Sequence, residues 1–230
     1  MQQQLWQDFF QGKNNLEEVN SLVAALLPSL SPPQKAPYWE LWDWLQQQQL
    51  VSSPPTSLQE ALFTLLSLKE LSLPKQQLSS LPHDIGLLWG LQTIELAHNH
   101  LQQLPISIGQ LPLLKSLSIA HNQLKNLPES IGQVLSLQQL KASHNQLEGI
   151  PDSLAWLQQL KEVDLSHNQL TQVPPDFAFL EHLRVVDLSY NKIGYWPDFL
   201  AHCKYPLQLN MRENPLAVPS SLPTSIELLF

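Results

Sequence analysis

The stretch LEGIPDSLAWLQQLKEVDLSHNQL, residues 147–170, begins inside one copy of SHNQL and ends on another. The two copies, 143–147 and 166–170, lie 23 positions apart. A catalytic loop is rarely written twice in one chain, whereas a unit that stacks on itself has to recur. The stretch therefore indicates a repeat architecture, in which the positions that vary between copies are free to carry function.

The 23-residue period extends along most of the chain, and each unit reads approximately L-x-x-L-x-L-x-x-N-x-L-x-x-L-P-x-x-I-G-x-L-x-x. The recurring asparagines are Asn99, Asn122, Asn145, Asn168, Asn191 and Asn214, and the recurring prolines are Pro82, Pro105, Pro128, Pro151, Pro174 and Pro197. Full copies start at Leu68, Leu91, Leu114, Leu137, Leu160 and Leu183, and a partial seventh starts at Pro206. The chain is therefore predicted to be built mainly from stacked coils.

The residue types within one unit predict its local structure. Alternating pairs such as Leu117/Ile119 point one side of a short strand into a core. Stacked coils then form a parallel sheet with about 4.8 Å between strands. The asparagine stands where the chain must turn, so its amide can bond backbone groups that would otherwise be buried without partners. The Leu-Pro pair that follows predicts an extended or 3-10 return segment, because proline fixes φ. Ala155 replaces the recurring Gly132, so we expect that position to require a small residue.

The two ends of the chain do not follow the period. Residues 1–67 are predicted to form a helical N-terminal cap region, with capping boxes at Asn15–Glu18 and Ser57–Glu60. The first box precedes an apolar helix face that ends at Pro28. The alternative is that tryptophans near Tyr38–Leu50 form a separate docking surface; they are Trp39, Trp42 and Trp44. Residues 68–219 are predicted to be the solenoid, and residues 220–230 its C-terminal cap.

Composition narrows the classes of function. The net charge of −8 argues against a nucleic-acid-binding surface. No apolar run approaches the roughly 18 residues that span a bilayer, and the N-terminus lacks a secretory signal pattern. The single cysteine, Cys203, falls at a repeat position that carries leucine in other copies, so we expect a buried structural thiol. We expect a cytoplasmic monomer, although signal-independent export would leave no trace.

These repeats resemble the leucine-rich-repeat superfamily, and most closely the 23-residue L-P-x-x-I-G type of bacterial repeat proteins and Ras-group plant intracellular proteins. The resemblance covers Leu68 to about Pro219. It implies an α/β solenoid with parallel strands on a concave, protein-binding face and 3-10 or irregular segments on the convex side. The near-identity of the copies favours a bacterial source. Secreted bacterial effectors that join such repeats to a ubiquitin-ligase domain are possible relatives, but their repeats are shorter. Because no domain follows the repeats here to carry a catalytic cysteine, we expect no ligase activity.

One outward column is histidine-rich without an evident reason in core packing. The residues just before the asparagines, or before Gln76 in the first unit, are Lys75, His98, His121, His144, His167 and Tyr190. They are open to three interpretations: polar residues copied by duplication, part of a partner-binding face, or a metal- or pH-sensing column. A metal would be held by His98, His100 and His121, but no carboxylate or thiol completes that set, so we predict no metal and no cofactor.

Three acidic residues, Glu162, Asp164 and Asp187, are expected beside the end of that column. No nucleophile accompanies them and an open sheet offers no pocket, so we predict a protein without enzymatic activity. We predict instead a partner-binding face that fits a basic protein. Its candidate residues are His98, His121, His144, His167, Glu162, Asp164, Asp187 and Tyr190. The rival hypotheses are recruitment through the tryptophan-bearing helices, a structural or self-assembling protein, and a secreted bacterial effector that acts by binding.

Overall fold

The computed structural model describes residues 32–51, 55–202, 205–216 and 226–229. The predicted capping box at Asn15–Glu18, the helix face after it and Cys203 lie outside the described residues.

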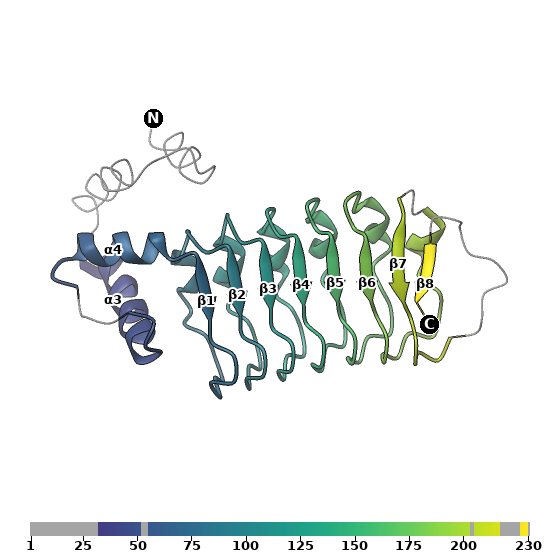
Figure 1. The fold of residues 1–230 in the computed structure, drawn as a ribbon, viewed down its shortest axis with the longest axis horizontal. Coiled ribbons are helices and arrows are strands. Elements are labelled where there is room, and N and C mark those ends of the chain that lie inside the picture. Colours follow the sequence, from purple (N-terminus) through teal and green to yellow (C-terminus); the bar gives the residue numbers. More distant parts are fainter. Residues whose placement is uncertain (1–31, 52–54, 203–204, 217–225, 230) are drawn as a thin grey trace.

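Eight strands form one parallel sheet whose spatial order follows the chain order (Figure 1). The strands are β1 (Glu70–Ser72), β2 (Thr93–Glu95), β3 (Ser116–Ser118), β4 (Gln139–Lys141), β5 (Glu162–Asp164), β6 (Val185–Asp187), β7 (Leu207–Asn210) and β8 (Ile226–Leu229). From β1 to β7 each residue pairs with the one 23 positions later, as Leu117 does with Leu140. Between β7 and β8 the offset falls to 19, with Leu207 opposite Ile226. The predicted parallel sheet is confirmed.

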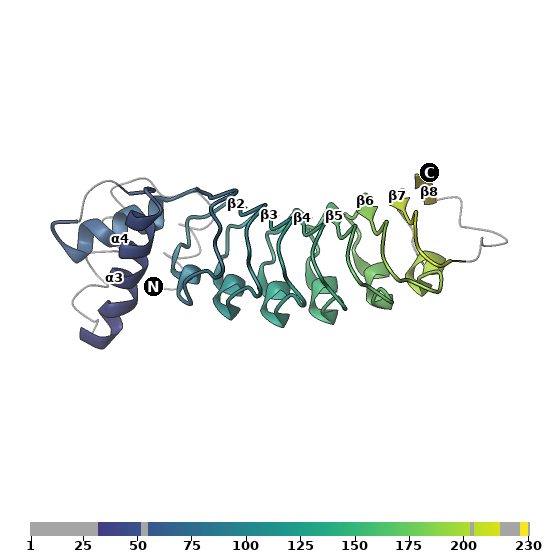
Figure 2. The same cartoon turned by 90° about the horizontal axis from the view of Figure 1, so that it is seen from below.

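Each return segment between β1 and β7 contains a short 3-10 helix on the side opposite the strands. These helices are η2 (Ile85–Leu87), η3 (Ile106–Gln110), η4 (Glu129–Gln133), η5 (Asp152–Trp156), η6 (Pro175–Phe179) and η7 (Asp198–His202). The recurring proline precedes η3 to η6 in extended conformation, as Pro128 does with φ −68° and ψ 145°. Figure 2 shows the strands in one shallow curve and the 3-10 helices in a second row behind it, which gives the predicted curved solenoid.

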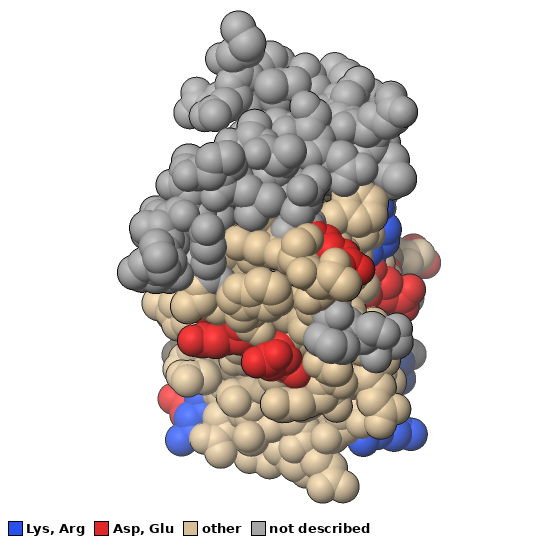
Figure 3. Space-filling view, turned by 90° about the vertical axis from the view of Figure 1, so that its left-hand side faces the viewer, with Lys and Arg blue, Asp and Glu red and all other residues tan. Residues whose placement is uncertain are grey.

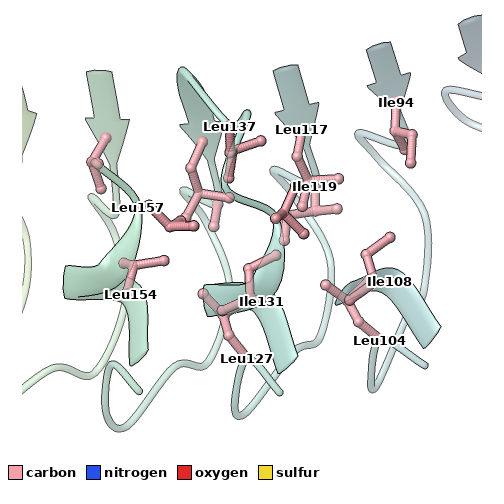
Figure 4. Packing of buried hydrophobic residues seen from close by; sticks show 14 of the residues in the cluster. Ile94, Leu104, Ile108, Leu117, Ile119, Leu127, Ile131, Leu137, Leu154 and Leu157 are labelled. Atoms are coloured by element: carbon pink, nitrogen blue, oxygen red, sulfur yellow. The ribbon is translucent and has the colours of Figure 1, made fainter. Parts of the chain in front are cut away.

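The core lies between these two rows and runs without a break along the coils. Figure 4 shows Ile131 and Leu154 from the 3-10 helices facing Leu117 and Ile119 from the strand side. All four side chains are fully buried. Because every coil buries its leucines against the next coil, stability comes from stacking rather than from any single unit.

The glycine position is tight because neighbouring return segments pack closely. A Cβ atom added at Gly132 would lie 2.4 Å from the carbonyl oxygen of Ser153, and Gly132 does not require a positive φ. The expectation that this position needs smallness is therefore confirmed at Gly132. The same position in the following coil holds Ala155, which is 4% exposed.

Two helices, α3 (Pro32–Gln47) and α4 (Leu58–Ser67), lie at the β1 end of the sheet (Figure 1). Leu41, Leu45 and Leu65 join the same apolar cluster as Leu71 of β1. The helices therefore bury the first core layer of the solenoid. The division into residues 1–67, 68–219 and 220–230 stays a prediction.

The start of α4 follows the predicted capping pattern with one variation. The Ser57 side chain accepts a hydrogen bond from the Glu60 backbone nitrogen at 3.2 Å. The Glu60 carboxylate reaches back to the backbone nitrogen of Thr56 at 2.7 Å, one residue before the position expected for a capping box. A hydrogen bond from the Thr56 hydroxyl, and then this backbone bond, lower the pKa of Glu60.

The three tryptophans of α3 differ in their surroundings. Trp42 is buried, Trp44 packs partly buried against the core, and Trp39 is 36% exposed. Figure 3 views this end of the molecule and shows acidic side chains gathered on its surface, with lysine or arginine nearer the margins. Packing therefore accounts for two of the three tryptophans, which leaves Trp39 as the one available for docking.

Candidate functional site: a stacked ring column beside an acidic sheet

The histidine-rich positions form one continuous stack of aromatic rings, which we call the ring column: His98, His121, His144, His167 and Tyr190. Neighbouring ring centroids lie 4.0–4.2 Å apart, and the planes differ by only 8–12°. The coil spacing brings these rings, which are 23 residues apart in sequence, into face-to-face contact. The structure therefore brings together five of the eight predicted site residues.

The backbone explains part of the choice of histidine. Residues of the ring column have φ between 52° and 59°, the left-handed region that non-glycine residues seldom adopt. Asn, Asp and His tolerate this region better than most residues. The conformation places each backbone N–H toward the next coil, as in the 2.9 Å bond from His121 to the Ser143 carbonyl oxygen. Sequence reasoning missed this requirement, although it also holds at Lys75 and Glu213, which carry no ring.

The column is open to solvent along one side. His98, His121 and His144 are exposed, His167 is half-buried, and Tyr190 is 50% exposed. Loss of hydration within the stack lowers the pKa of His121 and His144, and the charges of neighbouring histidines lower it further. The carboxylate of Asp164 acts in the opposite direction on both pKa values. The middle of the stack is therefore held neutral more firmly than an isolated imidazole.

The ring geometry argues against the metal interpretation. The lone pairs of an imidazole lie in its ring plane, so stacked parallel rings aim them side by side rather than at one point. A transition metal needs nitrogen ligands at about 2.0–2.1 Å that converge on it. Within the part of the chain that the structure describes, no group of three or more His, Cys, Asp and Glu residues is arranged to hold a metal ion.

Two of the predicted carboxylates are tied into the turns after their strands. The Asp164 Oδ1 atom accepts hydrogen bonds from the Ser166 backbone nitrogen at 3.0 Å and from its hydroxyl at 2.7 Å. Asp187 accepts the same pair of bonds from Ser189, at 2.9 Å and 2.6 Å. Glu162 accepts a bond from the Gln139 amide at 2.6 Å. These carboxylates are therefore fixed in position, and Asp164 and Asp187 also support the fold.

The charged residues on the outward side of the sheet are mostly acidic, and the acidic ones lie on β1, β2, β5, β6 and β8. Its charged side chains on strands β1 to β8 are Glu70, Glu95, Glu162, Asp164, Asp187 and Glu227 against the single basic residue Lys141. The predicted acidic patch is thus part of a larger acidic face, which the ring column borders.

The fold and this open, polar concave face are those of a repeat solenoid with an accessible strand surface. Comparison with known families gives the same answer. A family model described as leucine-rich repeat region matches residues 45–162, and one described as leucine rich repeat matches residues 149–216. The first match spans half of the chain, so the chain belongs to the leucine-rich-repeat family. The resemblance inferred from the repeats is confirmed.

One solved structure places the fold among known proteins. A leucine-rich-repeat protein of Leptospira interrogans shares 30% sequence identity with this chain, with a TM-score of 0.64. The match covers 79% of this chain and 52% of that protein, so the chain spans about half the length of its structural relative. Among curated proteins no match is found.

Family membership indicates a general kind of role. Leucine-rich-repeat domains generally mediate protein–protein interaction, and proteins of the family are typically binding modules without catalysis. In the described ranges of the chain, no helix has both the length and the apolar character that a bilayer crossing requires.

Proposed function

We propose that this chain binds a basic partner protein on its concave strand face, with the ring column and the neighbouring carboxylates as the main contacts. The observation that supports this most directly is the ring column itself. Five rings stand in one row open to solvent along one side, and each stacks on one or two neighbours at about 4 Å. Rings already ordered in the free protein lose little conformational entropy when a partner covers them.

Charge indicates the kind of partner. Six acidic residues face outward from the strands against one lysine. Glu162, Asp164 and Asp187 lie on the adjacent strands β5 and β6, near the end of the ring column that Tyr190 forms. A basic surface would be attracted to this region from a distance and would meet an aromatic edge at close range.

The decisive experiment neutralises charge without disturbing the turns. Asp187→Asn keeps an acceptor at its position, where Asn210 of the next coil already accepts a bond from the Arg212 backbone nitrogen at 3.2 Å. Glu162→Gln matches Gln139 of the preceding coil. The control variant carries Glu129→Gln and Asp152→Asn, which remove two exposed carboxylates from the convex side.

All three proteins serve as bait in lysate of the source organism, and the affinity of any captured protein is then measured with pure components. The concave variant, which combines Glu162→Gln with Asp187→Asn, is expected to bind at least about tenfold more weakly than wild type. The convex control is expected to bind as wild type does. Binding by the wild type should weaken as salt rises. Equal binding by all three proteins, with no salt dependence, would remove the concave face from the proposal.

Two rivals give different results in the same assay. A partner lost only with Trp39→Gln would place recruitment on the N-terminal helices, where Trp39 is the exposed tryptophan. A self-assembling protein would capture its own copies, and light scattering would show a mass that grows with concentration.

A further inference from the structure

A second repeat position, on the convex side of the solenoid, changes its residue type from one coil to the next. The equivalent residues at the ends of successive 3-10 helices are Leu87, Gln110, Gln133, Trp156, Phe179 and His202. Trp156 is 62% exposed and Phe179 is 66% exposed. Core packing does not require aromatic rings here, because glutamine occupies the position in two earlier coils. Large apolar side chains left in water on adjacent coils mark a surface suited to contact.

Phe179 also lines a groove of about 570 Å³ in the same region. Pro175, Ala178 and Tyr205 line its apolar part together with Phe179. Asp176 and Glu181, both exposed, line its acidic part. We call this the convex groove. It joins flat apolar surface to two carboxylates, which is a combination that suits a cation carried on an apolar stem.

The groove region already holds one such cation from the chain itself. The Arg184 guanidinium lies over the Tyr205 ring, 5.5 Å from its centroid. The same guanidinium donates to the carbonyl oxygens of Glu181 and Leu183, at 2.8 Å and 2.9 Å. This contact shows that the aromatic surface at this end of the solenoid accommodates a planar cation.

We propose that the convex groove is a second docking surface, which takes an extended segment of a partner protein bearing a lysine or arginine beside apolar residues. The cation lies against the Phe179 ring and near Asp176 and Glu181, and the apolar neighbours cover Pro175 and Ala178. The groove belongs to the row of 3-10 helices and not to the strands (Figure 2). The chain can therefore hold this segment and a concave-face partner at the same time.

Selection from a random peptide library displayed on phage tests this directly. Wild-type protein serves as bait, and peptides that also bind a groove variant with Phe179→Gln are discarded. Glutamine is native to this position in the coils of Gln110 and Gln133, so the variant should fold normally, which circular dichroism and thermal unfolding verify. Enriched peptides are expected to carry lysine or arginine beside apolar residues.

The best peptide is then titrated by fluorescence anisotropy, next to a twin in which citrulline replaces arginine or acetyl-lysine replaces lysine. Binding should weaken about tenfold with Phe179→Gln, and the preference for the charged peptide should vanish with Asp176→Asn and Glu181→Gln combined. The concave variant with Glu162→Gln and Asp187→Asn should bind the peptide normally. No enrichment over the groove variant, enriched peptides without a cation, or loss of binding in the concave variant would each overturn the proposal.

Discussion

Two columns of the repeat stand one residue apart and look equally regular in the sequence, yet they do different work. Asn145 is buried, and its amide nitrogen donates to the carbonyl oxygens of Ile119 and Ala142, at 3.0 Å and 3.1 Å. Its side-chain oxygen accepts a 3.0 Å bond from the Leu124 backbone nitrogen. His144 beside it is exposed, and its ring stacks on the rings of His121 and His167.

The difference shows that regular recurrence alone does not separate structure from function. The asparagine recurs because each coil leaves backbone groups inside, and its amide supplies them with hydrogen-bond partners. The neighbouring position needs a residue that accepts a positive φ, which Lys75 and Glu213 also do. The aromatic ring is therefore additional to what the backbone requires, and this is why we place the binding face there.

The largest expected effect on the free energy of unfolding comes from removing an asparagine side chain from the buried column. Asn145→Ala removes the partner of the Leu124 backbone nitrogen. The carbonyl oxygens of Ile119 and Ala142 lose one bond each but keep one from a neighbouring asparagine. A buried group without a partner costs about 1–3 kcal/mol, so the free energy of unfolding should fall by about that amount. Urea unfolding followed by circular dichroism measures the change. Gln146→Ala, an exposed change one residue away, should stay within about 0.5 kcal/mol of wild type. A loss below about 1 kcal/mol in Asn145→Ala would contradict the role given to this column.

The fold could be predicted from the sequence because each repeated residue has one local structural role. The period, the L-x-L alternation and the asparagine predicted the parallel sheet, its register and the amide bonds in the turns. The offset of 19 between β7 and β8 was not predictable, because no full unit covers that segment. The exact reach of Glu60 to Thr56 also depends on side-chain geometry that a capping motif does not specify.

The candidate site was less predictable, because its physical basis appears only when coils stack. Sequence placed His98, His121, His144, His167 and Tyr190 in one column, but neither the ring stacking nor the positive φ followed from residue type. The bonds that tie Asp164 and Asp187 to their own turns were also missed. The D-x-S pattern that begins at the last residue of β5 and of β6 was the available signal. Partner binding by these residues stays a prediction.

An intermediate effect on stability is expected from a pair of substitutions in the ring column. The pair separates the demand of the backbone conformation from the contribution of the ring. His144 has φ 53°, a conformation that costs a β-branched residue about 1–2 kcal/mol and that asparagine tolerates. His144→Val should therefore unfold about 1–2 kcal/mol more easily than His144→Asn, although both lack the ring. Urea midpoints of the two variants give the comparison. Equal stability of the two would mean that the turn does not impose the positive φ.

The smallest expected effect is a dependence of stability on pH that belongs to the ring column. Loss of hydration and the neighbouring histidines lower the pKa of His121 and His144 from the ordinary 6.5. The unfolded chain therefore binds more protons than the folded one as pH falls below 6.5, and folding is weakened there. Above 6.5 both states are neutral and the contribution vanishes.

A double variant isolates this contribution from that of the carboxylates. His121→Asn with His144→Asn removes the two titrating rings and keeps residues that tolerate the turn conformation. Urea midpoints at about pH 7.5 and about pH 5.5 should fall further for wild type than for the variant. Identical falls would mean that the two rings are protonated as easily in the folded stack as in the unfolded chain. In that event the column would still be an exposed aromatic surface, but protonation in the acidic range would not distinguish its folded from its unfolded form.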